Sequence, residues 1–454
     1  MSEETELVID SFCPRGYGVG KFKRPSPLPP LSVETAHVIP GDVVRVEMRK
    51  KMRGVRKGRL LEVLQSSSDR VSPRCVHATV CGGCSWQQMA YPAQLKEKQR
   101  RVESLFPGDF VSPIVGAEQI FGYRNKMEFT FSENRGGEKY LGLMIAQAEP
   151  YVFNLEECHL ASRWFSETVQ KVRGWWQESN LKAYHPFRNE GTLRYLTLRE
   201  GKRTDEKMVI LNVSGDPEWA ISRAELDRFA VLFSTESVFL RIHQTKKGTP
   251  TQFFEMHLKG ADHIFEELHL TQGKFSFKIS PSSFFQPNTL QAEVLYNTAL
   301  GFLSQEKIDT LYDLYCGTGT LGMAASRFAR QVIGVELSSE ALLDAEENRK
   351  RNQLENVRFY QGDVGKVLTR HPEMPLPDAV IVDPPRAGLD PLAMSHLQRL
   401  KPRFLLYISC NPLTQAENVK QFLRSGYQIQ VIQPVDQFPH TYHIENILLL
   451  KRID

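Results

Sequence analysis

The sequence predicts a multidomain protein whose last part is an α/β domain. The chain has 454 residues, more than one hydrophobic core usually supports, which indicates several domains. From about residue 290 onward, apolar strand-like runs alternate with amphipathic helical stretches, a pattern typical of a doubly wound, largely parallel sheet. The first 65 residues contain only short runs bounded by turn residues, and the stretch from about 122 to 280 is mixed. We therefore expect an N-terminal β-barrel, a central α+β domain and a C-terminal Rossmann-like α/β domain.

Composition narrows the class of protein. Hydrophobic residues make up 41% of the chain and charged residues 24%, as in an ordinary globular protein. The stretch "MSEETELVID" has no basic segment followed by an apolar core, and no apolar run reaches membrane-spanning length. We therefore expect a cytoplasmic protein without membrane association. Seven cysteines, an odd number in a chain without an export signal, favour metal-binding or catalytic roles over disulfides.

Residues 1–65 predict a small barrel of OB type. Apolar and basic residues alternate along "LVIDSF", "HVIPGDVVRVEM" and "GRLLEVL", and the turn "RGYGVGKF" is rich in glycine. Barrels of this type often bind nucleic acids. The run from Arg45 to Arg59 contains eight Lys or Arg and one Glu, which fits either a solvated face or a phosphate-contacting surface.

A cysteine-rich segment, residues 75–89, follows a polar linker. Its cysteines have the spacing C-x5-C-x2-C, and a fourth occurs in "NLEECHL", which gives the set Cys75, Cys81, Cys84 and Cys158. Four thiolates suit a tetrahedral zinc ion or an iron–sulfur cluster, and His77 or His159 could serve as a ligand instead. Local spacing leaves the two kinds of centre open, and zinc is the more common of them.

Further elements follow from hydrophobic periodicity. Residues 91–106 have a helical period with basic residues on the polar side, and 162–177 predict a second helix. Central strands are expected at 126–131, 140–145, 193–200 and 206–213. In the C-terminal domain, strands are expected at 310–316, 331–336, 357–363, 378–386, 403–410, 427–435 and 445–452, and helices at 317–329 and 338–352.

The first turn of the α/β domain carries a glycine motif. In "DLYCGTGTLG", Gly317, Gly319 and Gly322 match G-x-G-x-x-G, the dinucleotide fingerprint, and Glu336 at the end of the next strand could hold a ribose. By itself the motif is a weak signal, so a dehydrogenase is a real alternative to other nucleotide-binding enzymes.

Acidic residues at successive strand ends favour a different cofactor. Asp313 precedes the glycine turn, Asp363 ends "YQGD", and Asp383 opens "DPPR". Such acids suit a ligand with a ribose, an adenine amine and a cationic amino-acid tail, as in S-adenosylmethionine, and they suit a pyrophosphate poorly. Any one of them could simply cap a helix, but the set favours a methyltransferase over a dehydrogenase.

Cys410 is the candidate nucleophile. In "YISCNPLT" it follows an apolar run directly, at the strand end where α/β folds place their chemistry. A thiolate that adds to C6 of a pyrimidine makes C5 nucleophilic, so that C5 can attack a methyl group. The C5 proton must then leave, and Glu445, which adjoins the last apolar strand, is the candidate base.

Five motifs in order, "FFQPN", "DLYCGTGT", "VDPPR", "SCNP" and "FPHTYHIEN", resemble the RNA (uracil-5-)-methyltransferase family. The N-terminal barrel resembles the TRAM domain of that family. The resemblance implies three units: a TRAM-like barrel at 1–65, a central domain at 66–93 and 125–275, and an S-adenosylmethionine-dependent methyltransferase domain at 94–124 and 276–454.

The resemblance also implies roles for individual residues. Cys410 would be the nucleophile and Glu445 the base. The cofactor pocket would be lined by Gln286, Tyr315, Thr320, Glu336, Asp363 and Asp383. Family members vary at position 320. Phe284 and Phe285 are candidates for packing near the flipped base or the cofactor, with ordinary core packing as the alternative. The stretch "GYRNKMEF" resembles a family motif near the RNA-facing cleft.

One branch of the family modifies large-subunit ribosomal RNA and resembles this chain in its four cysteines, which there hold a [4Fe–4S] cluster. The resemblance implies that Cys75, Cys81, Cys84 and Cys158 bind such a cluster here. The branch that methylates transfer RNA lacks the cluster and the barrel, so the implied substrate is a uridine of 23S ribosomal RNA, methylated by a monomer. Transfer RNA, a cytosine-5 methyltransferase and a non-catalytic RNA-binding protein are the alternatives.

Overall fold

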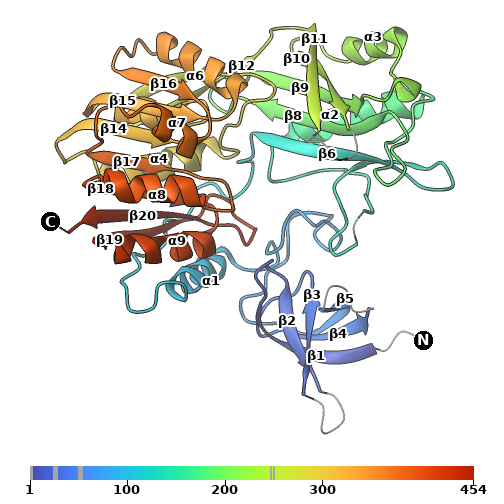
Figure 1. Cartoon of the computed structure of the whole chain (residues 1–454). Coiled ribbons are helices and arrows are strands. Elements are labelled where there is room, and N and C mark those ends of the chain that lie inside the picture. The colour runs from blue at the N-terminus through green and yellow to red at the C-terminus, as the bar shows by residue number, and fades with distance from the viewer. Residues whose placement is uncertain are drawn as a thin grey trace.

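The structure is a computed structural model that describes residues 4–23, 29–49, 55–148, 150–245, 248 and 251–453. Figure 1 shows a small barrel at the N-terminus, a sheet with helices in the middle of the chain, and a larger sheet covered by helices toward the C-terminus. The expected multidomain architecture, with a barrel first and an α/β domain last, is confirmed.

Five strands close into the N-terminal barrel in the order β1-β2-β3-β5-β4. Apolar side chains alternate along the strands, so that one face of each strand forms the barrel core. In β4, for example, Val44 and Val46 are fully buried, whereas Arg45 between them is half-buried. The strands are β1 (Glu4–Phe12), β2 (Gly18–Phe22), β3 (Leu31–Thr35), β4 (Val43–Met48) and β5 (Arg56–Gln65).

The middle of the chain forms a six-stranded sheet of order β11-β10-β9-β8-β6-β7. Helix α2 (Arg163–Gln177) packs into its core through Phe165, Val169, Val172 and Trp176, which are spaced three or four residues apart and share one helix face. The other elements are β6 (Lys126–Glu133), β7 (Lys139–Gly142), β8 (Leu193–Glu200), β9 (Lys207–Ser214), α3 (Arg223–Val231), β10 (Ser237–Gln244) and β11 (Gln252–Lys259).

The C-terminal sheet has seven strands in the order β16-β15-β14-β17-β18-β20-β19. The first five strands are parallel to one another, and β20 is antiparallel to both β18 and β19. Strands β17 and β18 are buried along their whole length, as expected where helices cover both faces. The strands are β14 (Ile308–Leu314), β15 (Ala329–Glu336), β16 (Val357–Gln361), β17 (Ala379–Val382), β18 (Phe404–Ser409), β19 (Tyr427–Val435) and β20 (Glu445–Arg452).

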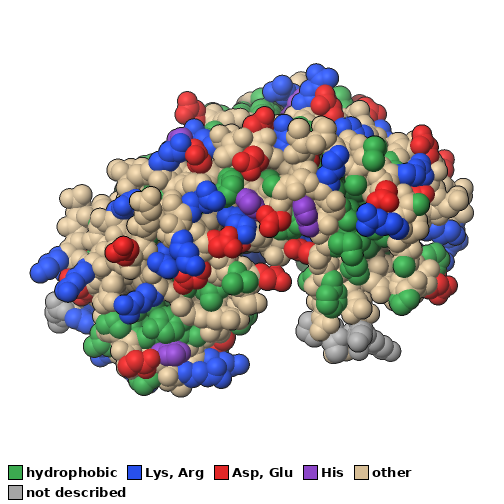
Figure 2. Space-filling model, turned by 90° about the horizontal axis from the view of Figure 1, so that it is seen from above, with side chains coloured by type: hydrophobic (Ala, Val, Ile, Leu, Met, Phe, Trp, Pro, Cys, Tyr) green, Lys and Arg blue, Asp and Glu red, His purple; other side chains and the backbone are tan. Residues whose placement is uncertain are grey.

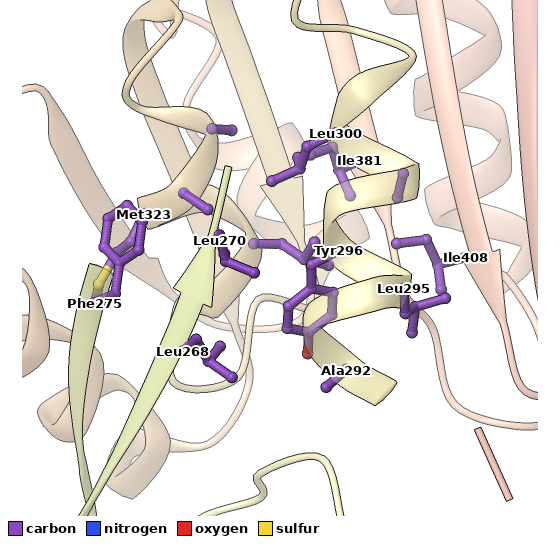
Figure 3. Packing of buried hydrophobic residues seen from close by; sticks show 14 of the residues in the cluster. Leu268, Leu270, Phe275, Ala292, Leu295, Tyr296, Leu300, Met323, Ile381 and Ile408 are labelled. Atoms are coloured by element: carbon purple, nitrogen blue, oxygen red, sulfur yellow. The ribbon is translucent and has the colours of Figure 1, made fainter. Parts of the chain in front are cut away.

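The helices of this domain are α5 (Thr320–Ala325), α6 (Ser339–Arg351), α7 (Val364–Arg370), α8 (Pro391–Leu400) and α9 (Pro412–Arg424). A hairpin of β12 (Ile264–Leu270) and β13 (Gly273–Ile279), followed by α4 (Thr289–Gly301), precedes them. Figure 3 shows how side chains from the hairpin, α4, α5 and the sheet meet in one apolar cluster, among them Leu268, Phe275, Leu295, Tyr296, Met323, Ile381 and Ile408. This packing holds the start of α4 close to the sheet. None of the helices in the described part of the chain is long and apolar enough to cross a membrane.

Helix α1 (Tyr91–Glu103) follows the cysteine-rich segment but packs against β19 of the C-terminal sheet (Figure 1). Its Lys98 is fully buried, with Nζ 2.6 Å from Asp436 Oδ1 and 3.1 Å from the carbonyl of Phe438. A buried charge is tolerated only when it is paired and hydrogen-bonded. The Lys98–Asp436 pair therefore fixes α1 to the segment that follows β19.

Replacing Lys98 by Met should lower the apparent melting temperature by several degrees. The substitution leaves the Asp436 carboxylate buried without its cation, which typically costs about 3–5 kcal/mol. Arg100→Met on the same helix is the control, because Arg100 is exposed and pairs with Glu97 of its own helix. Thermal unfolding of the two variants checks this, and equal melting temperatures would contradict the structural role of the pair.

Candidate active site

The carboxyl ends of the parallel strands form the candidate active site. The strand order reverses at β14, between β15 and β17, and ligands of open α/β sheets bind at such a reversal. In Figure 1, β20 runs toward the labelled C-terminus, so the carboxyl ends of the parallel strands lie at the opposite edge, on the side of the barrel and the central sheet. The side chains predicted for catalysis and cofactor binding lie at this edge or in the loops beside it: Gln286, Tyr315, Thr320, Glu336, Asp363, Asp383, Cys410 and Glu445.

The turn after β14 has the backbone geometry of a tight ligand-binding turn. Tyr315 has φ 64° and Gly319 has φ 82°, both in the left-handed region. A Cβ on Gly319 would lie 2.8 Å from Met323 Cε, and a Cβ on Gly322 would lie 2.8 Å from Asp313 Oδ2. The glycines therefore allow α5 to start close to the sheet. A left-handed tyrosine is a strained residue of the kind that clusters at functional sites.

Three of the acids predicted at strand ends bind backbone N–H groups of this edge. Asp313 accepts a hydrogen bond from the first turn of α5 at 2.7 Å, and Asp363 caps α7 by accepting one at 3.1 Å. Glu336 accepts one from the glycine turn at 2.9 Å and another from the start of α6 at 2.8 Å. The helix-capping alternative is therefore realised at Asp363. The half-buried Glu336 stands beside the glycine turn, where a ribose would lie.

Gln286, Tyr296 and Thr320 bring polar atoms together at the same edge. Gln286 lies in the loop before α4, is only 7% exposed, and lies near the Tyr296 hydroxyl. Thr320 Oγ1 lies 3.5 Å from that hydroxyl. Tyr296 was not expected from the sequence, because it occupies an apolar helix face and belongs to none of the motifs.

The strand register places Cys410 beside Glu445. Strand β18 pairs with β20 so that Ser409 lies opposite Asn446. Cys410 directly follows Ser409, and Glu445 directly precedes Asn446, so the two functional side chains occupy the next position of the ladder. Cys410 is half-buried and Glu445 is 4% exposed. The two residues that sequence reasoning linked across 35 positions therefore meet at one end of the sheet.

The charges around Cys410 largely oppose its ionisation. Burial raises the pKa of the Cys410 thiol to about 11, and the carboxylates of Glu445 and Asp383 add to the rise. Burial also raises the pKa of both carboxyl groups, and each lies close enough to the other to be affected by its charge. Among the described residues, Arg386 supplies the opposing effect, since its guanidinium lies near the thiol and its positive charge lowers the thiol pKa.

Arg386 is the second site residue that the sequence did not assign, although it belongs to the quoted "DPPR". Its carbonyl accepts hydrogen bonds from Asn411 Nδ2 at 2.9 Å and Thr414 Oγ1 at 3.2 Å. Pro412 then begins α9, a position where the missing proline N–H costs nothing. The Asn-Pro that follows Cys410 therefore ties the cysteine turn to Arg386 and starts a helix.

Two loops that border the site are joined to each other. Asn288 Nδ2 donates to the carbonyl of Gln437 at 3.0 Å, and Gln437 Nε2 donates to the carbonyl of Asn288 at 3.1 Å. Both side chains are almost fully buried. Arg199 anchors the first loop further back by donating to the carbonyls of residues 280, 281 and 283. The site thus has a fixed frame on both sides.

The residues predicted to contact RNA differ in their surroundings. Phe284 is 62% exposed beside Gln286, but Phe285 is 4% exposed and belongs to the apolar core, so its core-packing alternative holds. In "GYRNKMEF", the Arg124 guanidinium lies 5.8 Å from the Phe438 ring. Asn125 is buried and donates to the carbonyl of Gln286 at 2.8 Å, which makes it part of the frame.

The basic run of the barrel is partly neutralised. Arg45 pairs with Glu6 and Glu62, and Arg49 and Arg59 both pair with Glu47. Residues 50–54 of this run lie outside the described residues. Figure 2 views the molecule from above, away from the barrel at the bottom of Figure 1, and on that face too Lys and Arg are mixed with Asp and Glu. Arg56 donates instead to the carbonyl of Arg49, so the described part of the run is only partly neutralised and its role as a phosphate-contacting surface stays a prediction.

The four predicted metal-binding cysteines line one cavity of about 180 Å³ between the cysteine-rich segment and the loop before α2. All are unpaired thiols, and N–H groups point at three of the sulfurs: backbone groups at Cys75 and Cys81, and the Gln87 amide at Cys84. Burial raises the pKa of each thiol, to about 11 for Cys81.

The cavity is not arranged for a single ion. Within the described ranges, no three His, Cys, Asp or Glu side chains are grouped as ligands of one metal ion. The imidazoles offered as alternative ligands have other partners, since His77 Nε2 accepts from the N–H of Glu156 at 3.0 Å and His159 Nε2 lies 3.0 Å from a Glu157 oxygen. In this arrangement the side chains are therefore not gathered around one centre, as zinc ligands would be at about 2.0–2.3 Å.

Replacing Glu445 by Gln should stabilise the protein, and more so at high pH. The raised pKa of the Glu445 carboxyl means that the folded state disfavours its ionised form, so stability falls as the pH rises above the usual carboxyl pKa. Melting temperatures at pH 5 and pH 8 test this, with a gain of a few degrees expected at pH 8 and less at pH 5. Glu355→Gln, an exposed control, should show no such trend, and a gain independent of pH would contradict the assignment.

Comparison with known proteins agrees with this geometry. The family model described as tRNA (uracil-5-)-methyltransferase matches residues 90–362 and 374–453. An uncharacterized RNA methyltransferase of Protochlamydia amoebophila is 45% identical over 440 residues, which cover 92% of this chain and 99% of that protein. Another, from Caldanaerobacter subterraneus, is 35% identical over 445 residues and 96% of each chain.

One solved structure is similar over nearly the whole chain. The Pyrococcus abyssi tRNA (uracil-54, C5)-methyltransferase, in complex with S-adenosyl-L-homocysteine, superimposes with a TM-score of 0.76 and 26% identity. The match covers 98% of this chain and 100% of that one. These matches exclude the dehydrogenase alternative. The chain belongs to the tRNA (uracil-5-)-methyltransferase family and is a methyltransferase.

Proposed function

We propose that this protein transfers a methyl group from S-adenosylmethionine to C5 of a uridine in RNA. The observation that carries the proposal is the position of Cys410 beside Glu445 at the end of the β18–β20 ladder. A nucleophile and a base that lie opposite each other on neighbouring strands suit a reaction in which one group adds to a ring. The other group then removes a proton from the neighbouring ring atom. A protein that only bound RNA would have no use for this pair.

The chemistry divides between the two residues. The Cys410 thiolate adds to C6 of the uracil, and the C5–C6 π electrons become available at C5. S-adenosylmethionine, when bound, supplies an electrophilic methyl group for C5. Glu445 then takes the proton from C5, and the electrons of the C5–H bond restore the double bond as the sulfur leaves C6. Burial raises the pKa of the Glu445 carboxyl group, so the carboxylate accepts a proton readily and is an effective base.

The cofactor would be held at the carboxyl ends of β14 to β17. Glu336, beside the glycine turn, would bind the ribose hydroxyls, and Asp363 and Asp383 would face the adenine and the charged tail. Gln286, Tyr315 and Thr320 would complete the pocket. In support of this placement, the S-adenosyl-L-homocysteine complex of the Pyrococcus enzyme has the same overall fold. Phe284, exposed beside Gln286, would contact the flipped uracil.

For the RNA target we propose a uridine of 23S ribosomal RNA, with transfer RNA as the second candidate. The four cysteines favour ribosomal RNA, because they resemble the cluster-bearing branch of the family. The Pyrococcus enzyme favours transfer RNA, since that protein acts on tRNA and matches 98% of this chain. The presence of the barrel therefore does not distinguish enzymes that act on ribosomal RNA from enzymes that act on transfer RNA. We expect the enzyme to act as a monomer in the cytoplasm.

Tritium release from uracil C5 tests the reaction and the substrate together. Unmodified 23S ribosomal RNA and transfer RNA, each tritiated at C5, would be incubated with S-adenosylmethionine and the protein. We expect the wild type to release tritium to water from the ribosomal RNA and Cys410→Ala to release none, because C5 exchange requires addition at C6. Cys13→Ala, in the barrel, is the control that should retain release.

The outcomes separate the possibilities. Release from transfer RNA alone would keep the reaction and replace the substrate. Release undiminished in Cys410→Ala would remove Cys410 from the mechanism. No release from either RNA by a protein that binds S-adenosylmethionine would contradict uracil-5 methylation of these two substrates.

We further propose that Cys75, Cys81, Cys84 and Cys158 hold a [4Fe–4S] cluster. Four free thiols line one cavity, and a cluster presents four separate irons to four thiolates. N–H groups aimed at the sulfurs would stabilise the thiolate form. The methyl-transfer chemistry needs no redox centre, so we assign the cluster to folding or RNA contact.

Anaerobically purified protein should contain about four iron and four sulfide per chain, as the cluster formula requires. The double variant Cys81→Ser, Cys84→Ser should lose most of the iron, whereas Cys13→Ser should keep it. Metal analysis and an acid-labile sulfide assay provide the readout. One zinc per chain without sulfide would contradict the cluster.

A further inference from the structure

His443, which no step of the proposed reaction uses, lies beside the reaction centre. It stands two residues before Glu445 and is half-buried. Its Nδ1 is 3.1 Å from an Arg386 terminal nitrogen, and its ring centroid is 4.1 Å from that of Tyr442. The backbone N–H of His443 donates to Thr441 Oγ1 at 3.2 Å. The imidazole is thus held between an aromatic ring and a guanidinium.

The direction of the Arg386–His443 hydrogen bond is fixed by chemistry. A guanidinium has only donors and stays protonated, so Nδ1 must accept and the imidazole carries its proton on Nε2. Four cations lie close enough to His443 to affect its charge: Arg386, Lys98, Arg124 and Arg101. Burial first, and these cations in addition, lower the pKa of His443 to about 3. His443 is therefore neutral and able to accept throughout the physiological pH range.

Arg386 depends on such an acceptor. Its carbonyl is fixed to the start of α9, but its side chain is exposed, and within the described ranges it forms no ion pair with a carboxylate. An arginine side chain loses much rotamer entropy when it is ordered, so an unanchored guanidinium would sample many positions. We propose that His443 is a positioning residue that holds the Arg386 guanidinium against Cys410.

The segment that carries His443 is rigid enough for this task. Gln94 Oε1 accepts from the N–H of His440 at 2.8 Å, and Lys98 pairs with Asp436. The buried Asn288–Gln437 pair fixes the segment from its other side. A positioning residue acts only if its own place is fixed by surrounding hydrogen bonds, and residues 436–444 meet that condition.

The consequence is a local stabilisation of the Cys410 thiolate. The charged groups that face Cys410 are Glu445 and Asp383, which raise the pKa of the thiol, and Arg386, which lowers it. A guanidinium kept in place by His443 opposes the two carboxylates at all times. Without the His443 acceptor, the guanidinium would oppose the two carboxylates for only part of the time. The inference rests on the proposed role of Cys410 as the nucleophile.

The test measures the reactivity of Cys410 in the full chain without RNA or S-adenosylmethionine. Alkylation by iodoacetamide would be followed against pH by mass spectrometry of the peptide that contains Cys410, so the other cysteines do not interfere. We expect His443→Leu to move the alkylation midpoint upward by about one pH unit and to slow alkylation near pH 7 by about tenfold. His443→Asn, whose side-chain oxygen can take the place of Nδ1, should shift the midpoint by less than half as much.

Controls keep the result interpretable. His257→Leu, on the exposed edge strand β11, should leave the midpoint unchanged. If His443→Leu loses the wild-type thermal transition, His443→Gln is compared with His443→Asn instead. The side-chain oxygen of glutamine lies near the position of Nε2, not of Nδ1, so this variant also removes the acceptor for Arg386. A midpoint in the Leu or Gln variant equal to that of the Asn variant overturns the proposal. Failure of RNA methylation leaves this test intact, since alkylation requires no substrate.

Discussion

The antiparallel pairing of β18 with β20 is the constraint on which the candidate site depends. Side chains alternate between the two faces of a strand, so a slip of one residue in this ladder would turn Glu445 away from Cys410. The register is enforced by the core, because every residue from Phe404 to Ser409 is buried and Ile447, Leu448 and Leu450 of β20 are fully buried. Hydrophobic burial along the whole strand thus fixes the geometry of two polar groups at its end.

Several side chains at the same end of the sheet destabilise the folded state. A thiol and two buried carboxyl groups lie near one another, and burial raises the pKa of all three. Such an arrangement persists only where the surrounding structure determines it completely. Here that structure consists of the reciprocal Asn288–Gln437 pair and the anchors on Arg199 and Lys98.

The sequence predicted a residue's position best where that residue stands at the end of a strand. The strand-like run before Cys410 and the apolar run after Glu445 identified both positions, because the ends of neighbouring strands must meet at a sheet edge. The glycine turn was located for the same reason. The expected helix at 317–329 is shorter in the structure, where α5 covers Thr320–Ala325, because residues 317–319 form the turn itself.

Roles that depend on contacts between distant segments were missed. Tyr296 lies on an apolar helix face, which predicts that it packs in the core. Its hydroxyl lies between Gln286 and Thr320 because α4 approaches the glycine turn. Arg386 was visible in "DPPR", but its proximity to Cys410 depends on the α9 turn. The partial neutralisation of the basic run in the barrel was missed for a related reason, since the partners of Arg45, Glu6 and Glu62, lie on other strands.

Residues 436–444 connect the reaction centre with the parts of the chain expected to bind RNA. Trp86, from the cysteine-rich segment, donates its N–H to the carbonyl of His440 at 3.0 Å and its indole N–H to the carbonyl of Gly16 in the barrel at 3.0 Å. Gly16 leaves no room for a Cβ, which would lie 2.6 Å from Tyr442. The barrel and the cysteine-rich segment therefore pack directly on the segment that leads into Glu445. Because these contacts are close and buried, the barrel, the cysteine-rich segment and residues 436–444 are held together by direct packing beside the reaction centre.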